Sequence, residues 1–163
     1  GCIWTALDLI DGDTPRHDRP RGWVWPLTLL LSMQIIWGAF TAGLRAGHAS
    51  DTWPLMLGEL VPAGVLATAR DAIADPVSVQ FLHRSLAWLV AAAVLLVAWR
   101  LWRAGAGVRA LLLGGLVLTQ FALGVLVIIN HVPIPLGVAH QGVAALLVAA
   151  TVWAAHWSKR GRA

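Results

Sequence analysis

Two histidines, His83 and His140, are the residues whose type and spacing best suit chemistry. Each opens the same pattern, H-x3-A-x-L-x2-A-A, over positions 83–93 and 140–150. An imidazole nitrogen is a usual axial ligand of haem iron, and helix-bundle cores are a usual place for such sites. The other role open to both residues is a hydrogen bond to a neighbouring helix. The pair is therefore a candidate set of metal ligands for a haem, with interhelical hydrogen bonding as the alternative.

Arg84 stands next to the first of these histidines, at the head of a long apolar segment. Ionisable residues at the edge of hydrocarbon are costly, so they are functional candidates by default. A guanidinium near a haem can hold the propionates through charge-assisted, bidentate hydrogen bonds. Without a haem, Arg84 would extend its charge to the lipid headgroups. Arg84 joins the histidines as a candidate for cofactor binding, and no catalytic residue is assigned.

The composition is typical of a membrane protein. The chain has 163 residues, of which 58% are hydrophobic and 12% are charged, against about 25% charged residues in a soluble domain. Its net charge of +4 comes from basic residues that flank apolar segments, which indicates a lipid bilayer as partner and no nucleic acid. Tryptophans such as Trp23 and Trp102 stand at segment ends, as in an interfacial aromatic belt. The single cysteine, Cys2, excludes an intrachain disulfide and a multi-cysteine metal site.

Four apolar segments are close to the roughly 20 residues that span a bilayer. The predicted spans are 23–44, 76–102, 110–130 and 135–157. The pair Asp75-Pro76 suits the N-cap and first turn of the second span. These features predict an all-α integral membrane protein, a four-transmembrane-helix haem-binding bundle over residues 23–157 with an outer loop at 45–75.

Basic residues are concentrated at one end of the predicted bundle. They occur in the leading segment 1–22, around the turn 103–109 and in the tail 158–163, whereas the turn 130–136 has none. The positive-inside rule then places both termini in the cytoplasm. Residues 1–22 are therefore expected to be a cytoplasmic leading segment, and 158–163 a basic cytoplasmic tail. The outer loop is apolar enough to form a short interfacial helix that caps the bundle, with an ordinary ordered loop as the alternative.

A second internal echo precedes the histidine patterns. The segment from Gln34 to Gly38 parallels the segment from Gln120 to Gly124, with Gln and Gly at the same spacing. Together the two echoes predict two helical hairpins in a parallel pseudo-repeat. Both histidine-bearing spans would then enter from the outer side, so the imidazoles are expected at similar depth. The two glutamines and Asn130 are expected to be interhelical hydrogen-bond partners rather than substrate contacts.

The remaining histidines have weaker claims. His131 stands at the outer end of the third span, where an interfacial residue, a polar lid or a secondary ligand would fit. His48 falls in the outer loop and His156 near the cytoplasmic interface, and neither is expected to have a special role. No P-loop, dinucleotide-binding fingerprint or nucleophile motif occurs in the sequence.

Several motifs occur together in an order that resembles one known family. They are the stretches Gly38–Gly47, Asp51–Met56, Val79–Arg84 and His140-Gln141. In this order they resemble the C-terminal half of the haem A synthases, in the cytochrome oxidase assembly family, over roughly residues 23–157. The resemblance implies an oxidoreductase that converts the C8 methyl of haem O to a formyl group, giving haem A. It also implies two four-helix halves, each with histidines on its second and fourth helices.

The resemblance implies roles for named residues. His83 and His140 would ligate a b-type haem as a bis-histidine pair, and Arg84 matches the arginine after the first of them. The substrate half of the family has a glutamate three residues before its first histidine, whereas this sequence has Gln80, which cannot ionise. The chain is therefore expected to be the cofactor half, with haem O and haem A as substrate and product at a missing half.

The same resemblance implies partners and a location. The chain is expected to be a fragment of a longer enzyme, or a half-length relative that assembles with a second chain, and to be inactive alone. Haem O synthase and an electron donor are further expected partners, in the bacterial cytoplasmic membrane or an equivalent energy-transducing membrane. Two other functions stay open. A non-catalytic b-type cytochrome subunit or electron carrier would use the same histidines for haem, and a scaffold or transporter bundle would use them for hydrogen bonds.

Overall fold

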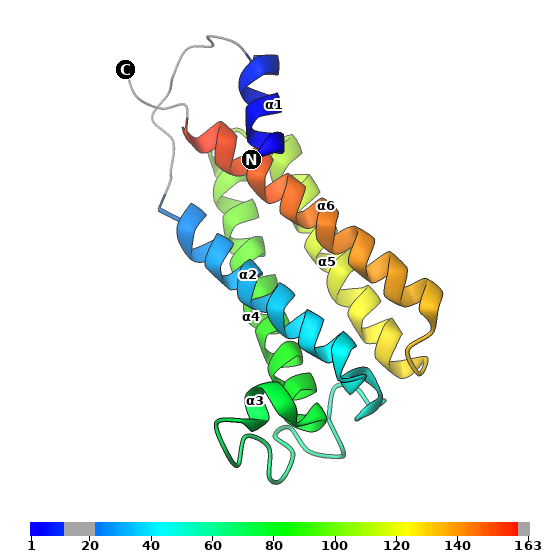
Figure 1. The fold of residues 1–163 in the computed structure, drawn as a ribbon. Coiled ribbons are helices and arrows are strands. Elements are labelled where there is room, and N and C mark those ends of the chain that lie inside the picture. The colour runs from blue at the N-terminus through cyan, green and yellow to red at the C-terminus, as the bar shows by residue number, and fades with distance from the viewer. Residues whose placement is uncertain (12–21, 160–163) are drawn as a thin grey trace.

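The computed structural model describes residues 1–11 and 22–159 of the chain. In chain order the elements are α1 (Cys2–Asp11), α2 (Val24–Gly43), the 3-10 helix η1 (Ala46–His48), α3 (Asp71–Ala74), α4 (Pro76–Arg103), α5 (Gly107–Ile129) and α6 (Ile134–Lys159) (Figure 1). The described residues contain no β-strand, only an isolated bridge between Met56 and Glu59. The prediction of an all-α chain is confirmed for this part. Residues 12–21 of the predicted leading segment and 160–163 of the predicted tail lie outside it.

Four of the helices, α2, α4, α5 and α6, are long and apolar enough to cross a membrane. Their number agrees with the four spans predicted from the sequence. Large apolar side chains such as Leu29, Leu96 and Leu111 are exposed on their surfaces, which suits helices surrounded by lipid tails that are as apolar as leucine. The chain is therefore a membrane protein.

The start of α4 forms as its sequence predicts. Pro76 occupies the first turn, and the carboxylate of Asp75 accepts a hydrogen bond of 2.8 Å from the backbone N–H of Ser78. This bond satisfies one of the N–H groups that a helix start leaves without an internal partner. The first residues of α4, which carry the candidate site, are therefore held in a defined position.

The turn between α4 and α5 is tighter than predicted. α4 continues to Arg103 and α5 already begins at Gly107, whereas the sequence placed the next span near residue 110. Gly105 lies between them with a φ of 81°, a backbone conformation that glycine adopts without a steric penalty. The chain therefore reverses its direction within this short turn, and α4 and α5 pack side by side.

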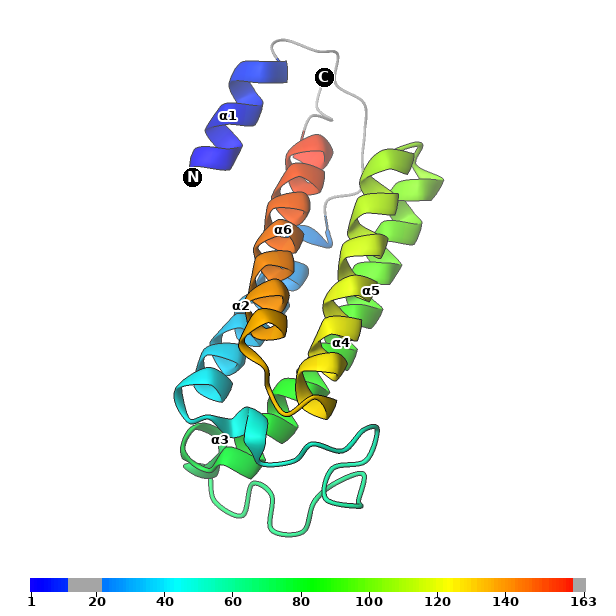
Figure 2. The ribbon, with the colours of Figure 1, turned by 90° about the vertical axis from the view of Figure 1, so that its right-hand side faces the viewer.

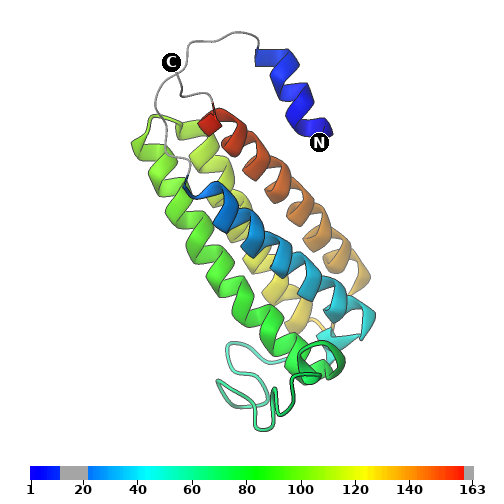
Figure 3. The ribbon, with the colours of Figure 1, turned by 60° about the vertical axis from the view of Figure 1, so that its left-hand side comes forward.

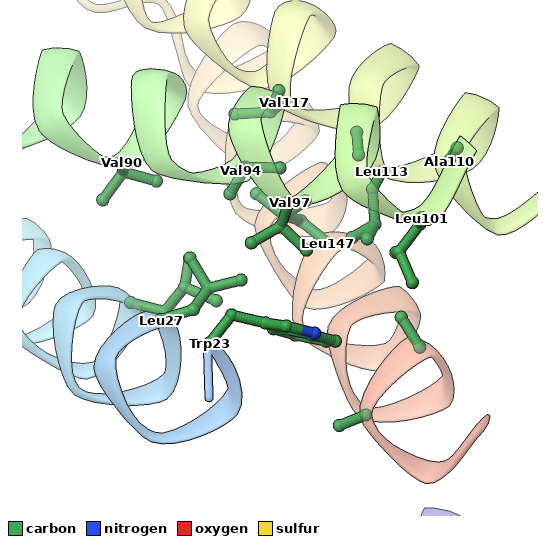
Figure 4. Packing of buried hydrophobic residues seen from close by; sticks show 14 of the residues in the cluster. Trp23, Leu27, Val90, Val94, Val97, Leu101, Ala110, Leu113, Val117 and Leu147 are labelled. Atoms are coloured by element: carbon green, nitrogen blue, oxygen red, sulfur yellow. The ribbon is translucent and has the colours of Figure 1, made fainter. Parts of the chain in front are cut away.

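The long helices pack in the order α2, α4, α5 and α6 (Figure 2, Figure 3). One cluster of buried apolar side chains joins all four, and Trp23 and Leu27 point into it toward Val94 and Val97 of α4 (Figure 4). Trp23 is only 6% exposed, so its predicted place in an interfacial belt is wrong, whereas Trp102 is exposed as a belt residue should be. The packed core lies in the half of the bundle nearer to α1.

The two ends of the bundle are built differently. α1 and the last turns of α6 lie at one end, and the outer loop lies at the other together with the turn between α5 and α6 (Figure 2). Between residues 45 and 75 the regular elements are only η1 and the single turn of α3. Most of the outer segment is thus an ordered loop, and its helical parts are limited to these two short turns.

Candidate haem-binding site

His83 and His140 lie at the same level of the bundle. His83 is seven residues after the start of α4, and His140 is six residues after the start of α6. Both helices begin at the end of the bundle that carries the outer loop (Figure 2). Both side chains are partly buried. The fold therefore places the two predicted ligands, which come from segments far apart in the sequence, at one level of the bundle.

A glutamine from a neighbouring helix contacts each histidine. Nε2 of Gln34 on α2 lies 3.3 Å from Nδ1 of His83 and 3.3 Å from its main-chain oxygen. Nε2 of Gln120 on α5 lies 3.1 Å from Nε2 of His140. The prediction of interhelical partners is confirmed for these glutamines, and the partners they meet are the two candidate ligands. It is wrong for Asn130, whose Nδ2 donates a hydrogen bond of 2.8 Å to the carbonyl of Leu126 on its own helix.

A glycine one turn after each glutamine makes room for the imidazole. A Cβ added to Gly38 would lie 3.2 Å from Cε1 of His83, and a Cβ added to Gly124 would lie 3.2 Å from Cε1 of His140. Both distances are shorter than an ordinary contact between carbon atoms, at about 3.5–4.0 Å. The sequence echo pointed to these glycines, but only the packing shows that they face the histidines.

The buried apolar core stops short of the histidines. On α2 and α5 its members nearest to the site are Leu31 and Val117, each three positions before the glutamine. On α4 and α6 the core begins at Val90 and Leu147, each seven positions after the histidine. The apolar packing therefore ends at the same level on all four helices, and half-buried and polar side chains surround the imidazoles.

These residues fit a bis-histidine haem by their own chemistry. Nδ1 of His140 is buried and has no hydrogen-bond partner among residues 1–11 and 22–159, a costly condition that a bound ligand would relieve. The glycine next to each ring lets the imidazole lie directly against the backbone of the neighbouring helix. Over the same residues, no three His, Cys, Asp or Glu side chains gather as a metal-binding group. Two imidazoles on different helices suit the axial positions of a haem iron.

Arg84 is turned toward the outer loop rather than the lipid headgroups. It is 8% exposed, and its Nη2 donates a hydrogen bond to the main-chain carbonyl of Thr52. Its guanidinium lies over the ring of Trp53, 5.2 Å from the ring centroid, within the range of a cation–π interaction. Nη1 of Arg84 is buried and makes no hydrogen bond to a described residue. The Nη1 amino group is thus left for an anion, while Nη2 binds the loop.

Gln80 holds the same loop from one turn earlier on α4. It is 1% exposed, and its Nε2 donates hydrogen bonds to the carbonyl oxygens of Gly47, at 3.2 Å, and Ser50, at 2.9 Å. Residues four apart lie on one face of a helix, so Gln80 and Arg84 form a polar face directed at the loop. Gln80 therefore has a structural role, because it binds the outer loop to α4.

The outer histidines lie at the surface. His131 is exposed, and its Nδ1 lies 3.4 Å from Oδ2 of Asp51, so it links the turn before α6 to the outer loop. His48 is exposed in η1.

His156 has a role that the sequence did not predict. It is 1% exposed, its Nε2 lies 2.8 Å from Oδ1 of Asp8, and its ring meets Trp4 edge-on at 4.9 Å. These contacts dock α1 on α6. Asp8 and His156 are 148 positions apart, so no local pattern reveals the pair.

Comparison with known proteins gives a consistent family. The family model described as cytochrome oxidase assembly protein matches residues 1–152. The haem A synthase of Rhizorhabdus wittichii is 42% identical over 161 residues, covering 94% of this chain and 46% of that protein. The haem A synthase of Rhodospirillum centenum is 39% identical over 161 residues, covering 93% of this chain and 43% of that protein.

A third relative, the haem A synthase of Maricaulis maris, is 41% identical over 165 residues, covering 97% of this chain and 48% of that protein. The chain thus spans a little less than half the length of these relatives. No solved structure shows significant similarity to it. Because the family model covers most of the chain and the relatives agree with it, this chain belongs to the cytochrome oxidase assembly protein family.

Proposed function

We propose that this chain is the cofactor-binding C-terminal half of a haem A synthase, the enzyme that oxidises the C8 methyl of haem O to the formyl group of haem A. In this proposal His83 and His140 are the axial ligands of one b-type haem, and Arg84 holds a propionate. A bound haem of this type supplies one-electron transfer at its iron. The reacting methyl group belongs to a site in the other half of the enzyme.

One observation carries the proposal. His83 and His140 come from different helices and share one level of the bundle, each beside a glutamine amide and a glycine. A histidine that ligates a metal has its other ring nitrogen held by a hydrogen bond in nearly every known site. Two imidazoles that each lie beside a glutamine amide, at the level where the apolar core ends, suit a bis-histidine haem.

The matched surroundings also support a parallel pseudo-repeat. The spacing from core to glutamine and from histidine to core is the same in both halves of the bundle. We infer that α2 with α4 and α5 with α6 are equivalent hairpins related by an axis along the membrane normal. Arg100, Arg103 and Arg109 flank the turn between α4 and α5, at the end of the bundle near α1. We infer that this end and both termini are cytoplasmic and that the outer loop faces the opposite side of a bacterial cytoplasmic membrane.

The expected partners follow from the lack of an acidic side chain at position 80. Gln80 has no acidic proton to transfer, and its amide is engaged with the outer loop. The chain therefore depends on a substrate half, in the same polypeptide or in a second chain, to oxidise haem O. Haem O synthase would deliver that substrate, and an electron donor would act through the haem of this half.

The haem assignment is tested by spectroscopy of the purified chain in detergent. We expect a low-spin b-type signal in the reduced-minus-oxidised spectrum, and we expect His83→Ala and His140→Ala to abolish it. The control is His48→Ala, because His48 is exposed in the outer loop. A folded, colourless wild-type chain, or unchanged spectra in both variants, would refute the ligand pair.

A second measurement separates the enzyme from a non-catalytic b-type cytochrome, which would bind haem with the same histidines. The chain is co-expressed with a source of haem O, with and without a separate substrate half. Haem A should accumulate only when the substrate half is present and His83 is intact. If loss of haem in this half leaves haem A production unchanged, the enzyme role is wrong.

A further inference from the structure

The contacts of Gln34 and Gln120 assign these residues a task beyond helix packing. Resting on the proposed function, we propose that they are positioning residues that orient the two axial imidazoles. When one ring nitrogen binds iron, each glutamine accepts a hydrogen bond from the N–H of the other ring nitrogen. The role as hydrogen-bond acceptor is inferred from the amide oxygens of the two glutamines. Oε1 of Gln34 and Oε1 of Gln120 are both buried, and neither has a hydrogen-bond partner among the described residues.

The amide of a glutamine suits this task because it carries a donor and an acceptor of nearly the same shape. In the present arrangement the amide nitrogen faces the imidazole in both pairs. Nε2 of Gln34 lies 3.3 Å from Nδ1 and 3.5 Å from Nε2 of His83, and Nε2 of Gln120 lies 3.1 Å from Nε2 of His140. A flip of the side-chain amide, which exchanges the positions of Nε2 and Oε1, would place Oε1 toward the ring instead. An imidazole that binds iron through one nitrogen must donate the proton on its other nitrogen, and an amide oxygen is an acceptor for it.

The position of each glutamine is set by the glycine that follows it. Gln34 and Gly38 are four residues apart, as are Gln120 and Gly124, so each pair lies on one face of its helix. Because glycine has no side chain, this face of the helix can approach the imidazole closely. A Cβ added at either glycine would lie only 3.2 Å from Cε1 of the facing histidine. The same pair of residues meets a histidine twice, on separate helices, so the arrangement is not a single accidental contact.

Leucine substitutions test the positioning role, because leucine keeps the bulk of glutamine and removes its polar atoms. We expect Gln34→Leu and Gln120→Leu each to weaken haem affinity by about 10- to 100-fold, the usual cost of losing such an outer partner. The low-spin electron paramagnetic resonance signal should also shift, because the ring orientation is no longer fixed. The matched control is Gln141→Leu, since Gln141 is adjacent to His140 but exposed.

Glutamate substitutions test the acceptor role. A carboxylate accepts the imidazole N–H more strongly than an amide and makes the ligand more basic. We expect Gln34→Glu and Gln120→Glu to retain haem and to lower its midpoint potential relative to the wild-type chain. An unchanged or raised potential in both variants would overturn the acceptor role.

Alanine at the glycines gives an independent readout if the glutamine variants do not fold. Alanine favours a helix more than glycine does, so Gly38→Ala and Gly124→Ala should fold while pressing on the imidazoles and altering the haem spectrum. Gly43→Ala on α2 and Gly115→Ala on α5 are the controls, because an added Cβ there meets nothing within 4 Å.

The outcomes separate this inference from the proposed function. If the wild-type chain binds haem through both histidines, but the glutamine and glycine variants match their controls in affinity, spectrum and potential, the positioning role fails and the haem assignment stands. If His83→Ala and His140→Ala leave the haem signal intact, the proposed function itself fails, and the positioning role fails with it.

Discussion

Nε2 of Gln80 lies 2.9 Å from the main-chain oxygen of Ser50 and also donates to the carbonyl of Gly47, so the first turns of α4 hold the outer loop from inside. The loop therefore depends on a donor at this position. An acidic residue in the same place would present oxygen atoms to two carbonyl oxygens. Because the family resemblance compares Gln80 with a glutamate of the substrate half, a change to glutamate tests what the amide contributes to the loop.

Gln80→Glu should destabilise the chain by about 1–3 kcal/mol, because it removes two buried hydrogen bonds and places like partial charges in contact. Thermal unfolding in detergent measures the loss. The deficit should shrink in acidic buffer, where a protonated carboxyl can donate one bond. Gln80→Leu is the control that removes the bonds without adding charge. An equally stable Gln80→Glu chain would show that the loop contacts contribute little.

Arg84→Ala should loosen the outer loop, because the bond to Thr52 and the contact with Trp53 are lost together. A hydrogen bond from a charged group contributes about 1.5–3 kcal/mol, so proteolysis within residues 45–75 should be at least several-fold faster. Arg84→Lys should recover only part of this, since an ammonium lacks the planar fork of guanidinium. Arg70→Ala, at an exposed position of the same loop, should leave the cleavage rate unchanged.

Asp75→Ala should lower the thermal midpoint, because the N-cap bond to the Ser78 N–H is lost. Loss of such a cap costs typically about 1 kcal/mol. Asp75→Asn keeps a side-chain oxygen at the cap and should retain most of the stability. If the alanine and asparagine variants unfold at the same temperature, the cap is not what stabilises the start of α4.

Asp8→Ala should release α1 from α6, because the bond to His156 joins them. A typical net hydrogen bond contributes about 1 kcal/mol. Amide hydrogen exchange in α1 should therefore accelerate by about five-fold, while exchange in α4 and α5 stays the same. Asp8→Asn can still accept the bond and should exchange at nearly the wild-type rate. Uniformly faster exchange in all helices would contradict a local role for the pair.

Several features of this protein follow from local sequence alone. The number of long apolar helices follows from segment length and composition, because about 20 apolar residues are needed to cross hydrocarbon. The start of α4 follows from Asp75 and Pro76, because capping is a contact within one turn. The histidine repeat pointed to His83 and His140 as a pair, because matched patterns predict matched positions.

Other features depend on how the helices pack. Gln34 and His83 are 49 positions apart, and only the packing of α2 on α4 brings the amide to the ring. The same reason applies to Trp23, which lies in the core instead of the interface, and to His156, which docks α1. Composition and spacing thus determined the helices and named the histidines, whereas tertiary packing decided what surrounds each imidazole, because contacts between distant segments are set by the relative placement of whole helices.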